Sequence, residues 1–308
     1  MLTAFRKNFK KYRLIAVLSI CLILLLHCGE QSSDSFTFVY MTDIHLQPEK
    51  SAVEGFEKAI ARTNTINPDF VLTGGDLIMD ALGQKESRAD SLYDLYQESV
   101  NNFKMPVYNT LGNHEVFGLY EESGIDPQHP EYGKAMYKKR LKQESSYYSF
   151  NHKGWHFMVL DGIGYTEDRH YYGKIDSLQI RWIKEDLKNI SKDTPLIIST
   201  HIPFYSLLAQ AEGGPTKSLS QGAVITNGNE VLELFEDYNL KLVLQGHLHI
   251  VEDLCYRGTH FITAGAVSGS WWNGPRYEFE EGFVVVEVRA DDFDWHYEDY
   301  GWEVAQKD

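Results

Sequence analysis

The chain has 308 residues, of which 43% are hydrophobic and 24% are charged, a balance typical of a globular protein with a substantial core. Its formal net charge of −15 makes a non-specific nucleic-acid-binding surface unexpected, because such a surface needs clustered lysine and arginine. The length allows one large domain or two small ones.

Residues 1–27 have the pattern of a signal peptide. Five basic residues and no acidic residue precede position 14, and an apolar run from Leu14 to Leu26 follows, with Ser19 as its polar interruption. This run is shorter than the ~20 residues that a membrane-spanning helix needs. We therefore interpret the segment as a signal peptide, with an uncleaved membrane anchor as the alternative.

The end of this segment, Leu25-Leu26-His27-Cys28, resembles the lipobox of bacterial lipoproteins, in which the cysteine becomes the lipidated first residue. His27 departs from that pattern, which usually has a small residue there. Residues 28–35 form a polar tether, and only Cys255 would remain as a free cysteine in the exported domain. We expect an exported protein, periplasmic or at the cell surface, that associates with the membrane through its N-terminal segment or a lipid on Cys28.

Residues 36–308 indicate one α/β domain. Apolar runs with strand character recur, and most lack the polar alternation of half-exposed strands, so we expect strands covered on both faces. The runs are Phe36 to Met41, Phe70 to Leu72, Pro106 to Leu111, Trp155 to Leu160, Pro195 to Ser199 and Leu240 to Leu244. Two helical stripes lie between them: Val53, Phe56 and Ile60, ended by Asn67-Pro68, and Leu178, Trp182, Ile183, Leu187 and Ile190, begun by Asp176 or Ser177.

The C-terminal part changes character. Short strands predicted at 261–263, 282–288 and 293–297 are consistent with an antiparallel extension of a sheet. Two long irregular segments, 116–131 and 203–228, each follow a polar cluster, so we expect them to form the rim of a substrate site. Trp271 and Trp272 could stack on a base or sugar, and we favour packing for both.

Five polar clusters follow predicted strands. They are Asp43-Ile44-His45, Gly74-Gly75-Asp76, Gly112-Asn113-His114-Glu115, Thr200-His201 and Gly246-His247-Leu248-His249. Each alone has a simple structural explanation, such as a turn, a helix cap or a packed core histidine. Together they indicate a ligand site, because ligands of α/β sheets gather at the carboxyl ends of the strands. In an extended backbone the last two histidines would point to the same side.

The ordered set DxH, GGD, GNHE, H and GHxH resembles the calcineurin-like metallophosphoesterases. The resemblance runs from about Phe36 to the C-terminal strands and implies a four-layer α/β/β/α sandwich of two mixed sheets flanked by helices. It also implies two metal ions. One would bind Asp43, His45 and His249, the other would bind Asn113, His201 and His247, and Asp76 would bridge them.

Carboxylate, amide and imidazole ligands suit Mn, Fe or Zn, and the absence of cysteine from the clusters argues against a closed structural zinc site. Two such ions roughly 3.5–4 Å apart can share a carboxylate and a hydroxide that attacks phosphorus in line. Asp76 therefore has the most demanding role among the ligands. Gly75, Gly112 and Gly246 each adjoin a ligand, where a missing Cβ allows tight turns and close approach.

His114 is not needed to complete either metal site. By the family resemblance it lies near the leaving-group oxygen, where an imidazole can donate a proton to the departing alkoxide. Glu115 would hold the tautomer of His114 or raise its pKa, unless it is a solvated carboxylate at the start of a helix.

Two positions differ from the motifs of purple acid phosphatases, which are one branch of the family. Purple acid phosphatases begin with DxG and have a tyrosine three residues after the bridging aspartate, whereas this chain has His45 and Met79 at those positions. We therefore expect no Fe(III) tyrosinate. The sequence favours a phosphodiesterase acting on a phosphoester substrate. The alternatives are a phosphomonoesterase, such as a protein phosphatase or nucleotidase, and a catalytically silent metal-binding scaffold; the oligomeric state stays open.

Overall fold

The computed structural model describes residues 35–304, so the predicted signal peptide and most of the tether lie outside the described residues. The strands are β1 (Phe36–Met41), β2 (Phe70–Thr73), β3 (Val107–Tyr108), β4 (Tyr148–His152), β5 (Trp155–Val159), β6 (Ile163–Tyr165), β7 (Tyr171–Gly173), β8 (Pro195–Ser199), β9 (Asn239–Gln245), β10 (Val251–Tyr256), β11 (Thr259–Ala264), β12 (Gly282–Arg289) and β13 (Asp292–Asp299). The α-helices are α2 (Ala52–Ile66), α3 (Glu86–Val100), α4 (Ala135–Arg140), α5 (Ser177–Leu187), α6 (Leu208–Gly213) and α7 (Gly228–Leu232), with 3-10 turns η1 (Asn113–Glu115), η2 (Glu121–Ser123) and η3 (Glu233–Phe235).

Two mixed sheets form the centre of the fold. The first has the order β13-β12-β1-β2-β3 and the second the order β10-β11-β9-β8-β5-β4, while β6 and β7 form a separate hairpin. In the first sheet β1, β2 and β3 run parallel, and in the second β5, β8, β9 and β11 run parallel. The carboxyl ends of the parallel strands therefore lie at one edge of each sheet.

The two sheets pack face to face through one side of their strands. Phe38, Phe70 and Val286 of the first sheet lie in one buried apolar cluster with Phe157 and Leu244 of the second. The Phe38 and Phe70 rings stack at 5.2 Å, and Phe157 meets both edge-on. This layer is the core between the sheets.

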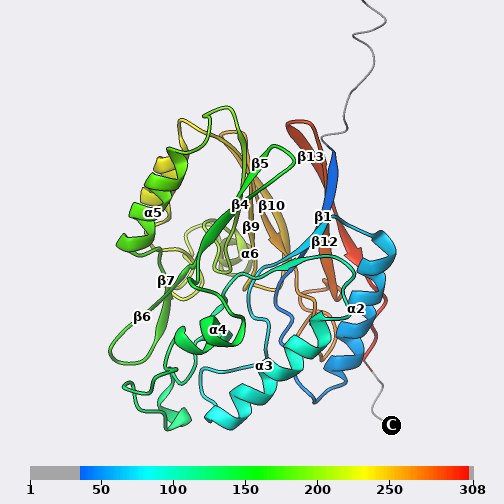
Figure 1. The fold of residues 1–308 in the computed structure, drawn as a ribbon, viewed down its shortest axis with the longest axis vertical. Coiled ribbons are helices and arrows are strands. Elements are labelled where there is room, and N and C mark those ends of the chain that lie inside the picture. The colour runs from blue at the N-terminus through cyan, green and yellow to red at the C-terminus, as the bar shows by residue number, and fades with distance from the viewer. Residues whose placement is uncertain (1–34, 305–308) are drawn as a thin grey trace, which may run out of the picture. The chain divides into compact units, whose positions relative to one another are not determined.

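Helices cover the outer faces of both sheets. Figure 1 shows α2 on the outer side of the sheet that holds β1 and β12, and α5 on the outer side of the sheet that holds β4 and β5. The apolar residues Phe56 and Ile60 of α2 are buried, as are Ile183 and Leu187 of α5. The four-layer sandwich implied by the family resemblance is confirmed.

The helix boundaries agree with the predicted signals. Asn67 ends α2 in the left-handed conformation, with its backbone N–H donating to the Thr63 carbonyl. The Asp176 side chain caps α5 by accepting from the Gln179 N–H at 2.8 Å. Leu178 does not belong to the buried stripe of α5, because its side chain is 61% exposed in the first turn.

The C-terminal strands are divided between the two sheets, which differs from the single antiparallel extension expected. Strands β12 and β13 extend the first sheet antiparallel to β1. Strand β11 instead lies parallel to β9 in the second sheet and pairs antiparallel with β10. The predicted strand Pro106 to Leu111 is shortened to β3, because its last residues turn toward the polar edge of the sheet.

Candidate metal centre

The five polar clusters of the sequence meet at the carboxyl edges of the two sheets. Asp43 and His45 follow β1, and Asp76 follows β2. Asn113 follows β3 in the first sheet, while His201 and the two histidines after β9 come from the second sheet. The structure brings all seven predicted ligands together, and six of them are at most 2% exposed.

One group consists of Asp43, His45 and His249. The Nε2 of His249 lies 3.2 Å from Asp43 Oδ1 and 3.1 Å from His45 Nε2. The Nδ1–H of His249 donates to the Gly269 carbonyl at 2.5 Å, so in the neutral ring its Nε2 presents a lone pair. Asp43 Oδ1 has no hydrogen-bond partner among residues 35–304. The lone pairs of Asp43 Oδ1 and of His249 Nε2 therefore face one point, with His45 Nε2 beside them.

The second group consists of Asn113, His201 and His247. The Nδ1–H of His201 donates to the Gly74 carbonyl at 2.8 Å, which leaves its Nε2 to face the group. That nitrogen lies 3.0 Å from Asn113 Oδ1 and 3.2 Å from His247 Nδ1. The two histidines of Gly246-His247-Leu248-His249 thus belong to different groups.

Asp76 stands between the two groups. Its Oδ2 lies 3.2 Å from His201 Nε2 and 3.7 Å from His45 Nε2, whereas its Oδ1 accepts the His114 backbone N–H at 2.9 Å. One oxygen is held by the backbone and the other faces both groups. This is the placement that a bridging carboxylate requires.

Burial and the neighbouring charges shift the pKa values of these side chains. Burial lowers the pKa of His45 to about 4 and that of His247 to about 3, so both imidazoles are neutral near pH 7. Burial opposes ionisation of Asp76, yet His201, His114 and His45 hold the pKa of that carboxyl well below its usual range. Burial also opposes protonation of His201, but Asp76 raises its pKa to about 9.

The donor set fits two divalent cations. Asp43, His45 and His249 offer ligand atoms within 4.8 Å of one another, and so do Asp76, His201 and His247. Oxygen and imidazole nitrogen donors of this kind bind Mn, Fe or Zn. The one cysteine among the described residues, Cys255, is exposed and lies outside both groups.

The backbone at the ligands is unusual. Asp43, His45, Asp76, His247 and His249 all have φ between 46° and 70°, in the left-handed region. The expectation of an extended backbone at Gly246-His247-Leu248-His249 was therefore wrong, and the divergence of the two imidazoles comes from a turn. Such conformations cost about 1 kcal/mol or more each and persist where the surroundings enforce them.

Glu115 joins two of the ligand loops. Its carboxylate is fully buried; Oε2 accepts the backbone N–H groups of Asp76 and Gly112, and Oε1 accepts those of Leu77 and Ile78, over 2.8–3.2 Å. Burial and then the Asp76 charge raise the pKa of Glu115 to about 7, against the four N–H donors that favour its anion. Glu115 is neither solvated nor in contact with the imidazole of His114, and its main role is to fix the Asp76 loop.

His114 lies beside the two groups and is partly exposed. Its ring is 4.5 Å from that of His45, and its Nε2 lies 3.8 Å from Asp76 Oδ2. The Nδ1–H donates to the Met79 carbonyl, so the tautomer is set by that carbonyl rather than by Glu115. Burial would lower the pKa of His114, but Asp76, Asp80 and Glu115 raise it. The side chain is 20% exposed, so part of it is open to a substrate.

Two adjacent tryptophans have different roles that the sequence did not separate. Trp272 is buried, packs against Gly55 of α2, and donates its Nε1–H to the Ile44 and His45 carbonyls at 3.0 and 3.1 Å. Trp271 is partly exposed and lies 4.6 Å from the His249 ring. The predicted packing role is therefore correct for Trp272, whereas Trp271 forms a wall of the site.

The first of the two long segments predicted as rim loops is held by hydrogen bonds, whereas most residues of 211–221 in the second are exposed. Arg169 holds the first by donating to the carbonyls of Leu119 and Ile125 at 2.7 and 3.0 Å. The second contains α6 and approaches the site through Gly222, where an added Cβ would meet the Tyr171 ring at 3.5 Å. Tyr171 in turn lies 6.1 Å from the His247 ring, edge-on.

A family model described as "Calcineurin-like phosphoesterase" matches residues 36–251, which is more than half of the chain. The chain belongs to this family. Members of the calcineurin-like phosphoesterase family are metal-dependent phosphoric ester hydrolases that typically bind two divalent metals. The family resemblance found in the motifs is thus confirmed.

Individual relatives are distant. The chain is 27% identical to purple acid phosphatase 15 of Arabidopsis thaliana over 48% of its own length, but it spans only 25% of that protein. It is 21% identical to a Xenorhabdus bovienii protein named "probable cyclic nucleotide phosphodiesterase", over 82% of this chain and 96% of that one. The structure of a dimetal phosphatase from Danio rerio matches with a TM-score of 0.62 at 13% identity, over 86% and 96% of the two chains.

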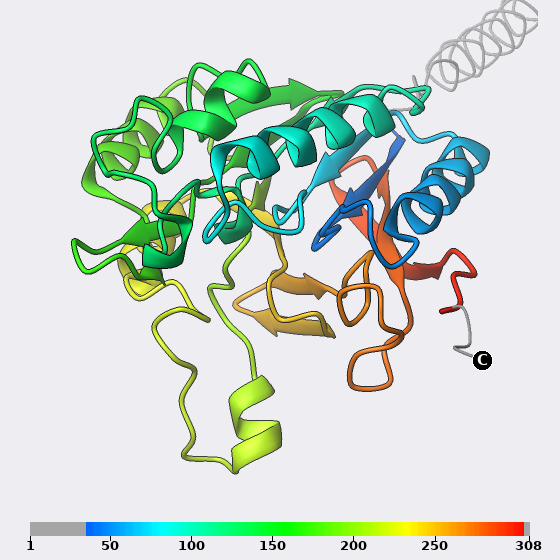
Figure 2. The same ribbon diagram turned by 90° about the horizontal axis from the view of Figure 1, so that it is seen from below.

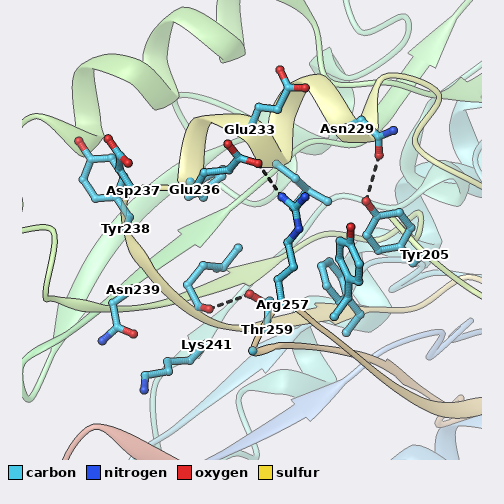
Figure 3. A pocket seen from close by; sticks show the side chains of 16 residues that line it. Tyr205, Asn229, Glu233, Glu236, Asp237, Tyr238, Asn239, Lys241, Arg257 and Thr259 are labelled. Carbon is cyan, nitrogen blue, oxygen red and sulfur yellow. Dashed lines mark hydrogen bonds and ion pairs between the residues drawn. The ribbon is translucent and has the colours of Figure 1, made fainter.

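This calcineurin-like phosphoesterase also has a large hollow away from the ligand groups (Figure 3). The hollow lies around Asn239 at the start of β9, whereas the two histidines follow the end of that strand. Two pairs of its polar side chains interact: Tyr205 donates to Asn229 at 3.0 Å, and Arg257 forms an ion pair with Glu236 at 2.8 Å. None of the 16 side chains drawn belongs to the ligand groups, so this hollow is not the candidate metal centre.

Glu115→Gln should lower stability and weaken metal binding together. One end of a glutamine amide is a donor, so two of the four backbone N–H groups would lose their acceptor, at a cost of about 2–4 kcal/mol. We expect this loss in urea unfolding, with a reduced metal content by elemental analysis. Glu121→Gln, at an exposed glutamate of η2, is the matched control. Wild-type stability and metal content in Glu115→Gln would contradict the role assigned to this residue.

Proposed function

We propose that the protein is a dinuclear metal-dependent phosphodiesterase, with Mn, Fe or Zn as the metal. The observation that carries the proposal is the meeting of two groups of electron-pair donors on one carboxylate oxygen, Asp76 Oδ2. His114 lies beside that oxygen with a fixed tautomer. This combination supplies a place for a phosphoryl group and a proton donor next to it.

The roles of the residues follow from their positions. When bound, two divalent cations would polarise the phosphoryl group and lower the pKa of an attacking water. Asp43, His45 and His249 would hold one cation, Asn113, His201 and His247 the other, and Asp76 both. His114 would direct its Nε2 toward the leaving-group oxygen and protonate it as the ester bond breaks. The raised pKa of His114 favours the protonated form needed for that step.

A preference for diesters is supported by charge and by sequence. A diester has one negative charge at its phosphate, whereas a monoester dianion has two, and neither group of ligands contains a lysine or arginine. The alignment that spans most of both chains is to the protein named "probable cyclic nucleotide phosphodiesterase". The partial match to a purple acid phosphatase supports phosphomonoesterase activity as the second candidate.

The substrate preference can be measured with a matched pair of chromogenic esters. The Mn²⁺-loaded protein should hydrolyse bis(4-nitrophenyl) phosphate with a higher kcat/KM than 4-nitrophenyl phosphate. The reverse order would establish a phosphomonoesterase. Two bound metals with hydrolysis of neither ester would favour a catalytically silent scaffold.

His114→Ala should keep both metals and lose turnover selectively. Since the imidazole protonates the leaving group, kcat for diesters with alkyl leaving groups should fall by about 10²–10⁴-fold, and kcat for 4-nitrophenyl leaving groups should fall much less. His170→Ala removes an exposed histidine and is the control. An equal loss for both leaving groups, or an empty metal site, would count against proton donation by His114.

We further propose that the protein is exported and attached to the membrane through Cys28. The support is the sequence of residues 1–35 alone; no helix of the described part is long and apolar enough to cross a membrane. Cys28→Ser should move the protein from the membrane fraction to the soluble fraction. Unchanged membrane association would indicate an uncleaved anchor, and a soluble wild-type protein would refute attachment.

A further inference from the structure

The loop between β11 and β12, residues 265–281, forms one wall of the site and is drawn in orange in Figure 2. Trp271 contacts the ligand histidines, at 4.6 Å from the His249 ring and 5.9 Å from the His45 ring. The guanidinium of Arg276 lies over Trp271 at 4.7 Å and over Tyr277 at 4.9 Å. A cation is thus held between two aromatic rings, one indole away from the candidate metal centre.

The loop is built to hold this arrangement. Trp271, Trp272, Tyr277 and Glu278 all have positive φ, between 49° and 67°, which is costly for bulky side chains. The hydrogen bonds of Trp272 to the Ile44 and His45 carbonyls fix the loop to the ligand segment. Trp271 is therefore anchored next to His249, and Arg276 packs on its ring.

Two basic side chains converge here without acidic partners. Neither Arg276 nor Lys50 forms an ion pair with any carboxylate of residues 35–304. Lys50 donates to the Trp271 carbonyl at 3.3 Å, and the Arg276 Nε–H is buried with no hydrogen-bond partner in the same part of the chain. Residues 265–281 also contain Glu278, Glu280 and Glu281, so this wall is marked by the placement of the two cations against Trp271 and not by a net positive charge of the loop.

The opposite charge lies beside the proton donor. Asp80 Oδ1 is 3.9 Å from His114 Nδ1, so an anionic leaving group would be repelled there. If the leaving group takes the side of His114, the side of Trp271 is left for the group that stays on the phosphate. The Trp271 ring already contacts an imidazole and a guanidinium, so it supports Arg276 rather than offering a free stacking face for a base.

We propose that Arg276, supported by Trp271 and assisted by Lys50, binds a second anionic group on the retained part of the substrate. The substrate class is then a phosphodiester whose retained alcohol carries a carboxylate or a further phosphate. A guanidinium held between aromatic rings suits such a group, because its planar N–H donors match the oxygens of carboxylate and phosphate. This inference rests on the proposed phosphodiesterase function.

The test uses two 4-nitrophenyl diesters that differ in one charge. The retained group of one is 3-hydroxypropanoate, and that of the other is its neutral carboxamide. For the Mn²⁺-loaded wild type, kcat/KM should be about tenfold higher for the carboxylate, and this ratio should fall with added salt. Arg276→Gln should bring the ratio to about one, because the charge-assisted hydrogen bonds are lost.

Arg257→Gln is the matched control, since Arg257 also stacks on a tyrosine, Tyr256 at 5.3 Å, but lies in the hollow at the start of β9. It should keep the wild-type ratio. A wild-type ratio near one, or an unchanged ratio in Arg276→Gln, would overturn the anion site while leaving the phosphodiesterase function intact. Hydrolysis of neither diester alongside hydrolysis of 4-nitrophenyl phosphate would instead refute the phosphodiesterase function, and the anion site with it.

Discussion

The buried carboxylate of Glu115 is the constraint on which the geometry of the site depends. It accepts four backbone N–H groups from two loops that follow neighbouring strands, β2 and β3. A carboxylate placed among four donors cannot move without leaving several of them unsatisfied, and each such loss is costly in a buried place. Asp76 is thereby held at the point where both groups of ligands can reach it. Gly112 lets the loop after β3 approach the Asp76 loop closely, because a Cβ at position 112 would lie 2.2 Å from the Asp76 nitrogen.

The left-handed backbone at the ligands follows from the need to place side chains around two neighbouring cations. Two neighbouring cations need ligands that approach from diverging directions, and an extended strand end would present alternate side chains in parallel. A left-handed residue turns the chain sharply enough to separate His247 from His249. The conformation is held by surrounding hydrogen bonds: His45 N–H donates to the Asp76 carbonyl at 2.9 Å, and the Ser268 hydroxyl donates to the Asp43 carbonyl at 2.8 Å. The stability of the two sheets is what maintains these turns.

Much of the fold was predictable because its signals are local. Continuous apolar runs gave the buried strands, and Asn67 and Asp176 marked the helix ends through their own capping preferences. The pairing of β11 with β9 was not predictable in this way, since strand partners are chosen by packing across the whole chain. The candidate ligands were found because their motifs are contiguous. The turn at His247 and three of the four hydrogen bonds of Glu115 depend instead on residues more than 30 positions away.

The wall formed by Trp271 adds residues to the site that belong to none of the five sequence motifs. The motifs supply the groups that would hold metal, and these groups contain no lysine or arginine. Any discrimination between substrates must then come from residues outside them, and the charges there are unequal: Asp80 stands by His114, while Arg276 and Lys50 stand by Trp271. Under the proposed phosphodiesterase function, unequal charges on the two sides would favour one of the two orientations of a diester, and so would select the ester bond that faces the proton donor. Orientation of this kind contributes to catalysis as well as to specificity, because only one of the two binding modes is productive.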